Sequence, residues 1–145
     1  MTFSHPCVCT TLRKASRAVT RAYDEGLADS GMTITQFAVL RNLDRQGAMP
    51  LSRLAELLVM DRTSLYRLIA PLERHGWVSV ADGAGRAKLA SITDAGRAAM
   101  LAATPAWEKV QDGLVGAMGA EAWAALQTQL RVLGSAAHAD LKRTR

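Results

Sequence analysis

The stretch that decides the fold runs from Pro50 to Val80 and reads PLSRLAELLVMDRTSLYRLIAPLERHGWVSV. Its first part places leucines at helical spacing and ends in a short connection, Val59 and Met60. Asp61 suits the N-cap of the next helix, because its carboxylate can accept hydrogen bonds from the free amides two or three residues on. We expect that helix to bury Leu65, Leu68, Ile69 and Leu72. Two short helices joined by so brief a turn predict a helix-turn-helix.

A β-hairpin is predicted directly after the second helix. The apolar period changes there from helical to alternating, with Val78 and Val80 on one side of a strand. Residues 82–85, Asp-Gly-Ala-Gly, suit a flexible tip. Leu89 and Ile92 then resume the pattern on a returning strand.

Helices are also predicted on the N-terminal side of this stretch. One runs roughly from Thr10 to Ala28, with apolar residues at helical spacing. Thr35 suits the N-cap of the next helix, whose apolar residues are Phe37, Leu40 and Leu43.

The C-terminal part of the chain predicts two more helices. Thr93 suits the N-cap of a long helix, and Pro105 is expected to kink it or to restart it with Thr104 as a new cap. Gly119 should end it. The last helix carries one apolar stripe: Trp123, Leu126, Leu130, Leu133, Ala137 and Leu141. Two such helices have little core of their own, so they need a partner surface, such as the first helix or a second subunit.

Composition narrows the class of protein. The chain has 145 residues, 49% of them hydrophobic, which suits a folded domain rather than a disordered one. The formal net charge of +5 favours a polyanionic partner, nucleic acid first. No run is apolar enough to span a membrane, and residues 1–10 lack the pattern of a signal peptide. We therefore expect no membrane partner and a cytoplasmic location.

Catalytic motifs are missing from the sequence. It contains no G-x-S-x-G, no Walker loop, no H-E-x-x-H and no carboxylate pair in an evident cleft. We expect neither an enzyme nor a cofactor.

The second helix of the helix-turn-helix has the residues that a groove-reading helix needs. Arg67 can donate two hydrogen bonds to a guanine, while small hydroxyls in the first turn can bond phosphate or base. The hairpin adds basic residues just past its glycine-bearing tip, where a thin loop can enter the minor groove. The candidate DNA-binding residues are Arg62, Thr63, Ser64, Tyr66, Arg67, Arg74, Arg86 and Lys88. The plain alternative is a solvated helix face, but the helix-turn-helix, the hairpin and the net charge agree on DNA.

Two further groups of residues are candidates for sensing. Cys7 and Cys9 form a Cys-x-Cys that could respond to oxidation or soft metals, although two ligands per chain do not make a closed metal site, and we expect no resident metal. Arg17, Arg21 and Trp107 could line a ligand pocket, the alternatives being a solvated face for the arginines and dimer core for the tryptophan.

The runs LAELLVMDRTSLYRLIAPLERHGWVSV and GRAKLASITDAGR resemble the winged helix-turn-helix of the MarR (multiple antibiotic resistance regulator) family. The matching features are a leucine-rich helix, a recognition helix opened by Asp61-Arg62-Thr63, Pro71-Leu72-Glu73 and Gly76 before the wing, and Ile92-Thr93 with Gly96 after it. The family wing often reads Asp-x-Arg-x-x-Arg, whereas this one reads Asp82-Gly83-Ala84-Gly85-Arg86, so only the last arginine is kept.

The resemblance implies a mainly α (α+β) fold in which residues 35–96 form the winged helix-turn-helix. Residues 1–34 and 97–145 would form a helical dimerisation region. It also implies a homodimer on double-stranded DNA, with recognition helices in major grooves, a wing arginine in the minor groove, and an aromatic or phenolic effector bound between the two regions. We therefore expect a ligand-responsive repressor of a pseudo-palindromic operator. The alternatives are a thiol- or metal-responsive regulator that senses through Cys7 and Cys9, and a protein-binding adaptor that uses the same fold without DNA.

Overall fold

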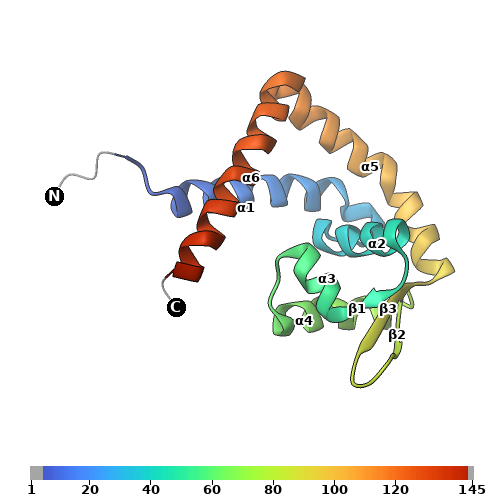
Figure 1. Cartoon of the computed structure of the whole chain (residues 1–145). Coiled ribbons are helices and arrows are strands. Elements are labelled where there is room, and N and C mark those ends of the chain that lie inside the picture. The colour runs from blue at the N-terminus through green and yellow to red at the C-terminus, as the bar shows by residue number, and fades with distance from the viewer. Residues whose placement is uncertain (1–4, 144–145) are drawn as a thin grey trace. The chain divides into compact units, whose positions relative to one another are not determined.

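The computed structural model describes residues 5–143 as a chain of helices with one small sheet (Figure 1). The order of elements is α1 (Val8–Gly26), the 3-10 turn η1 (Ala28–Ser30), α2 (Ile34–Gln46), β1 (Met49–Pro50), α3 (Leu51–Leu58), α4 (Arg62–Arg74), β2 (Val78–Asp82), β3 (Lys88–Ile92), α5 (Asp94–Met118) and α6 (Ala120–Arg143). The chain divides after Trp107, within α5, into two compact units. The predicted fold class, a mainly helical winged helix-turn-helix, is confirmed.

The core of the first unit is built from the apolar stripes of α2, α3 and α4. Leu65, Ile69 and Leu72 of α4 are almost completely buried, as predicted, and Leu68 is half-buried. Each such side chain contributes roughly 1.5–3 kcal/mol through its burial. This packing leaves the opposite face of α4 to the solvent. In the described range, 5–143, no helix is both long and apolar enough to cross a membrane.

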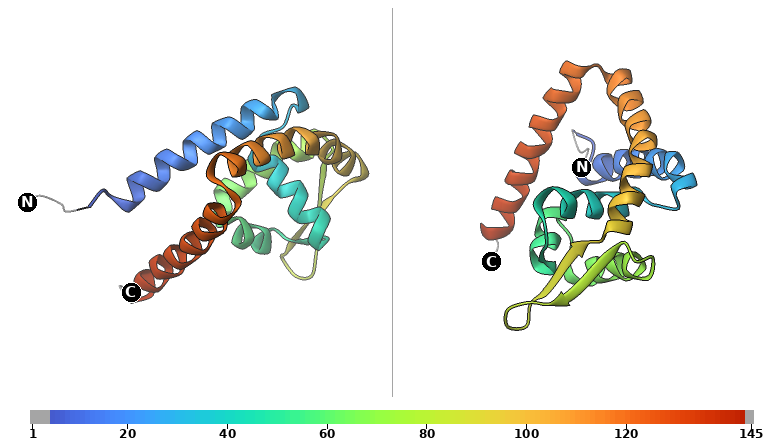
Figure 2. Two further views of the ribbon diagram at one scale, coloured as in Figure 1. Left: turned by 90° about the horizontal axis from the view of Figure 1, so that it is seen from above. Right: turned by 90° about the vertical axis from the view of Figure 1, so that its right-hand side faces the viewer.

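The sheet has three antiparallel strands in the order β1-β3-β2. The predicted hairpin is confirmed, with Val80 opposite Ala90 and a loop that extends away from the helices of its own unit (Figure 2). Strand β1 was not predicted. It consists of Met49 and Pro50 alone, which is too short for an alternating pattern, and a proline lies at a sheet edge because it has no amide to donate.

The predicted N-caps Asp61 and Thr93 are confirmed. The amide of Ser64 donates to Oδ1 of Asp61 at 2.8 Å, and the amide of Gly96 donates to Oγ1 of Thr93 at 3.0 Å. Both bonds satisfy a donor that has no partner within its helix.

The predicted N-cap of α2 at Thr35 is wrong, because Thr33 takes that role. The amide of Gln36 donates to Oγ1 of Thr33 at 3.2 Å, and the amide of Thr33 donates to Oε1 of Gln36 at 3.0 Å. This reciprocal capping box satisfies two donors, whereas a cap at Thr35 would have no glutamine three residues on.

Both helical prolines are accommodated inside continuous helices. α5 runs through Pro105, which rules out the restart at Thr104, one of the two predicted alternatives; the other, a kink, stays a prediction. The Thr104 hydroxyl donates to the carbonyl of Met100 at 2.9 Å. α4 likewise continues past Pro71 to Arg74. Gly119, at φ 88°, separates α5 from α6 as predicted.

The turn between α3 and α4 is held by a residue in an unfavourable conformation. Val59 has φ 52° and ψ 48°, and its side chain is 92% exposed. The amide of Met60 then donates to the carbonyl of Ala55 at 2.9 Å and closes the turn. A left-handed conformation costs a residue with a Cβ about 1–2 kcal/mol, which is the energetic cost of so short a connection.

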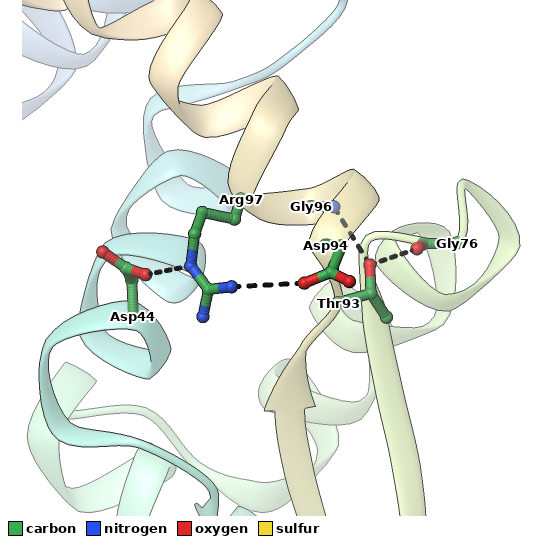
Figure 3. A network of polar contacts seen from close by, with 6 residues as sticks. All are labelled: Asp44, Gly76, Thr93, Asp94, Gly96 and Arg97. Carbon is green, nitrogen blue, oxygen red and sulfur yellow. Dashed lines mark hydrogen bonds and ion pairs between the residues drawn. The ribbon is translucent and has the colours of Figure 1, made fainter.

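The start of α5 packs directly on the backbone that leaves α4. The amide of Trp77 donates to the carbonyl of Leu72 at 2.9 Å, and the Trp77 carbonyl accepts from the amide of Thr93 at 3.0 Å. The Thr93 hydroxyl donates to the carbonyl of Gly76 at 2.6 Å (Figure 3). A Cβ on Gly96 would lie 2.0 Å from the Trp77 carbonyl oxygen, so only glycine fits there.

An ion pair links the same end of α5 to α2. Nε of Arg97 donates to Oδ1 of Asp44 at 2.7 Å, and Nη1 lies 3.4 Å from Oδ1 of Asp94 (Figure 3). Asp44 raises the pKa of the Arg97 guanidinium. Because both partners are well exposed, the pair contributes little to stability and mainly orients the two helices.

Replacing Gly96 should destabilise the fold, because this residue lies directly against the Trp77 backbone. Gly96→Ala forces the Trp77 backbone to move and should cost about 1–3 kcal/mol of unfolding free energy. Gly113→Ala, in the same helix, meets nothing within 4 Å and should gain about 1 kcal/mol from helix propensity. Urea denaturation of both variants checks this. A Gly96→Ala protein as stable as wild type would contradict the close approach.

Candidate nucleic-acid interface

Helix α4 presents two chemically different faces. One face packs Leu65, Ile69 and Leu72 into the core. Five of the predicted DNA-binding residues are exposed on the rest of the helix: Arg62, Thr63, Tyr66, Arg67 and Arg74. The division follows from the helical spacing of the apolar residues, so the fold itself turns the basic residues outward.

Ser64, a sixth predicted residue, serves the start of α4. It is half-buried, and its hydroxyl donates to Oδ2 of Asp61 at 2.7 Å. The hydrogen bonds from Ser64 hold the pKa of the Asp61 carboxyl below its usual range. Ser64 therefore orders the first turn of the helix, and its hydroxyl proton is already in use.

The arginines of this face form no ion pair within the described part of the chain. Across residues 5–143, no carboxylate pairs with Arg62, Arg67 or Arg74. Arg53 on the neighbouring helix differs, since its Nη1 lies 3.2 Å from Oε2 of Glu56. An exposed, unpaired guanidinium can donate several hydrogen bonds to an anionic partner.

The two cations of the wing are in different states. Lys88 lies opposite Asp82 across the hairpin and forms an ion pair with it. The pair raises the pKa of Lys88 and lowers that of Asp82. Arg86, in the exposed loop, has no carboxylate partner in the described part of the chain. Asp82 was not predicted to matter, although two residues that flank a hairpin tip are expected to face each other.

A small crevice brings part of the predicted set together. It lies between α3, α4 and the wing, and Arg62, Tyr66, Arg86 and Lys88 line it. Thr63, Arg67 and Arg74 are not among its lining residues. Ser52, which was not predicted, also lines it.

Trp107 lies in an aromatic cluster of the first unit. Its ring stacks on those of Phe37 and Tyr23, with centroids 5.6 Å and 6.5 Å apart. The guanidinium carbon of Arg41 lies 4.3 Å from the Trp107 ring centroid, and burial lowers the pKa of Arg41. A hollow of about 280 Å³ is lined by Ile34, Phe37, Ala38, Arg41, Asn42, Arg45 and Trp107. Arg41 was missed because its contact with Trp107 joins residues far apart in the sequence.

The other two predicted pocket residues lie elsewhere. Arg17 and Arg21 line a shallow surface of α1 together with Thr20, Asp24, Glu25 and Ala28. This surface shares no lining residue with the hollow at Trp107. The structure therefore does not bring the three predicted residues into one pocket.

Cys7 and Cys9 are both exposed and free at the start of α1. Cys7 is the N-cap residue of α1, although its side chain makes no cap hydrogen bond, and the nearby amide and hydroxyl of Thr10 lower the pKa of its thiol. In residues 5–143, no group of three or more His, Cys, Asp or Glu side chains could hold a metal ion.

Comparison with known proteins agrees with this geometry. The MarR family model matches residues 32–82, which run from before α2 to the end of β2. The Mycobacterium tuberculosis transcriptional regulator MosR, in a crystal structure with DNA, is 36% identical over 92% of this chain and 98% of its own, with a TM-score of 0.85.

A second relative is a MarR family transcriptional regulator from Streptomyces coelicolor. It is 30% identical over 90% of this chain and 92% of its own, with a TM-score of 0.78. No curated protein matches the sequence. The shared fold, the extent of the matches and the outward basic face of α4 lead to one conclusion: the chain belongs to the MarR family of winged helix-turn-helix transcriptional regulators.

Proposed function

We propose that the protein is a homodimeric repressor that binds a pseudo-palindromic operator and releases it when an aromatic effector binds. The observation that carries this proposal is the outward face of α4, where Arg62, Arg67 and Arg74 lie unpaired among the described residues. The relative that was crystallised with DNA supports the same partner.

The recognition helix and the wing would read different parts of the duplex. Arg67, in the middle of α4, reaches a guanine edge in the major groove, and Thr63 in the first turn contacts phosphate or base. Arg86 at the wing loop enters the adjacent minor groove. In a dimer, two copies of α4 would occupy successive major grooves.

Two arginine substitutions separate base reading from backbone attraction. Arg67→Ala should lose about 1–3 kcal/mol on the operator and blur its discrimination at one base pair. Arg86→Ala should weaken binding to all sequences and reduce the salt slope by about one unit. Fluorescence anisotropy with cognate and point-mutated duplexes over a range of salt concentrations measures both.

Arg53→Ala is the matched control, because Arg53 is exposed and already paired with Glu56. It should change neither the discrimination nor the salt slope. Salt-independent binding of the wild-type protein, or none at all, would favour the adaptor that uses this fold without DNA.

The terminal helices support the dimer. α1 buries only Tyr23, and α6 buries no residue within its own chain. Exposed apolar side chains on them include Val8, Leu12 and Val19 of α1, and Leu126, Leu130 and Leu141 of α6. Uncovered stripes of this kind favour a partner helix. Residues 1–34 and 97–145 are accordingly proposed as the dimerisation region, and residues 35–96 as the DNA-binding domain.

A charge placed on the α6 stripe should break the dimer. Leu130 lies on this stripe. Leu130→Asp should weaken dimerisation by about tenfold or more, because a carboxylate would be buried in the interface without a partner. Val132→Asp is the control. Val132 is even more exposed, at 60% against 39%, but two positions along the helix turn it to the opposite side.

Sedimentation over a range of protein concentrations measures both variants, with circular dichroism to confirm that α6 stays helical. Equal weakening by both substitutions, or none by Leu130→Asp, would contradict the stripe as the interface.

The hollow at Trp107 supports an anionic aromatic effector. Phe37 and Trp107 offer aromatic surface for stacking, and Arg41 and Arg45 offer positive charge beside it. An aromatic acid that displaced Arg41 from the Trp107 ring would also shift α2, which packs against the core under α4.

A thiol switch is the second candidate, because the exposed Cys7 has a lowered pKa. A thiolate attacks hydrogen peroxide and breaks its O–O bond, which forms a sulfenic acid and releases hydroxide, and a proton from the solvent converts the hydroxide to water. Condensation with the second thiol then gives a disulfide and a second water. The net reaction oxidises two thiols and reduces one peroxide.

Operator release by phenolic acids and by peroxide distinguishes the two candidates. We expect phenolic acids to release the DNA, with the half-maximal concentration raised about tenfold by Arg41→Gln and unchanged by Cys7→Ser with Cys9→Ser. Release by peroxide alone, lost in the double cysteine variant, would favour the thiol switch. Insensitivity of every variant to both would contradict both candidates.

A further inference from the structure

The crevice beside the wing has the size of a small anion site. It has a volume of about 60 Å³ and lies between the start of α3, the first turn of α4 and the start of β3. That is room for a few water molecules and is far below the roughly 300 Å³ of pockets for drug-sized ligands. Buried Leu51 and Leu65 line its inner side. The elements that build it come together only in the folded unit.

The side chains around the crevice carry an excess of positive charge. Arg62, Arg86 and Lys88 line it, and none of its lining residues is a carboxylate. Lys88 has Asp82 as a partner, whereas Arg62 and Arg86 have none in residues 5–143. Ser52 and Tyr66 add hydroxyl groups. The Arg62 guanidinium, the Lys88 ammonium and the two hydroxyls can all donate hydrogen bonds to the oxygens of a phosphate in so small a space.

The crevice also opens next to the surface that would meet DNA. Arg62 and Tyr66 are exposed on α4, as Arg67 is, and Arg86 belongs to the wing loop. Helix α3 begins at the same crevice, directly after Pro50. The side chain of Pro50 makes no cap hydrogen bond to the amides in the first turn of α3. Those amides are additional donors beside the cations.

We propose that this crevice binds one phosphate of the DNA backbone in each half-site, an inference that rests on the proposed function. The bound phosphate would touch the helix-turn-helix and the wing at once. It would therefore fix the distance between the groove that α4 reads and the groove that the wing enters. Asp82 acts as a positioning residue, because its ion pair holds the Lys88 ammonium on β3.

The test is an operator in which one phosphate at a time is replaced by an uncharged methylphosphonate. Binding is measured at low salt, so that every variant still binds. For wild type, one position per half-site should weaken binding roughly tenfold. For Arg62→Gln and for Lys88→Gln, the same position should cost only about threefold, because one of the two charges that it meets is already gone. Arg53→Gln, outside the crevice, should keep the full tenfold loss.

Three other outcomes have distinct meanings. If wild type binds the operator but no position has a smaller effect in both crevice variants, this proposal fails and the proposed function stands. If inorganic phosphate at millimolar concentration, against chloride of equal ionic strength, weakens DNA binding without any coupled position, the crevice binds a free anion and the proposal is again overturned. If wild type does not bind duplex DNA at all, the proposed function itself fails.

Discussion

The contact between Gly96 and the backbone of Trp77 is the constraint on which the rest of the domain depends. The Trp77 amide closes the end of α4, its carbonyl accepts from Thr93 at the end of the hairpin, and Gly96 opens α5 directly against it. Recognition helix, wing and long helix therefore meet at one peptide group. A shift of any one of them would be passed to the other two, since a packed backbone contact cannot stretch.

Much of the fold could be predicted because apolar residues recur at regular spacing over long stretches of the sequence. The burial of Leu65, Ile69 and Leu72 follows from helical spacing over a helix of 13 residues, which no single neighbour can override. Features that depend on one or two residues were harder to predict from the sequence. The cap at Thr33 depends on Gln36, and a strand of two residues has no period to detect. Continuity through Pro105 is set by packing along α5 rather than by the proline alone.

The candidate interface divides in the same way. That the arginines of α4 point outward follows from the apolar stripe on the opposite side, so sequence alone could find them. Which of the charged residues form ion pairs could not be predicted from the sequence. Lys88 forms an ion pair with Asp82, and Arg41 stacks on Trp107, which lies far from it in the sequence. Contacts of that kind exist only once the chain has folded, and they decide which charges remain free for a partner.

Helix α6 spans 24 residues and buries none of them within its own chain. Since most helical stability in proteins comes from packing, the order of this helix would be governed by mass action if the proposed homodimer forms. At equilibrium the number of dimers rises with the square of the monomer concentration. A cell with few copies would hold much of the pool as monomers, each with a single recognition helix and weak hold on an operator. The abundance of the regulator would then act as a regulatory signal in its own right, alongside any molecule that it senses.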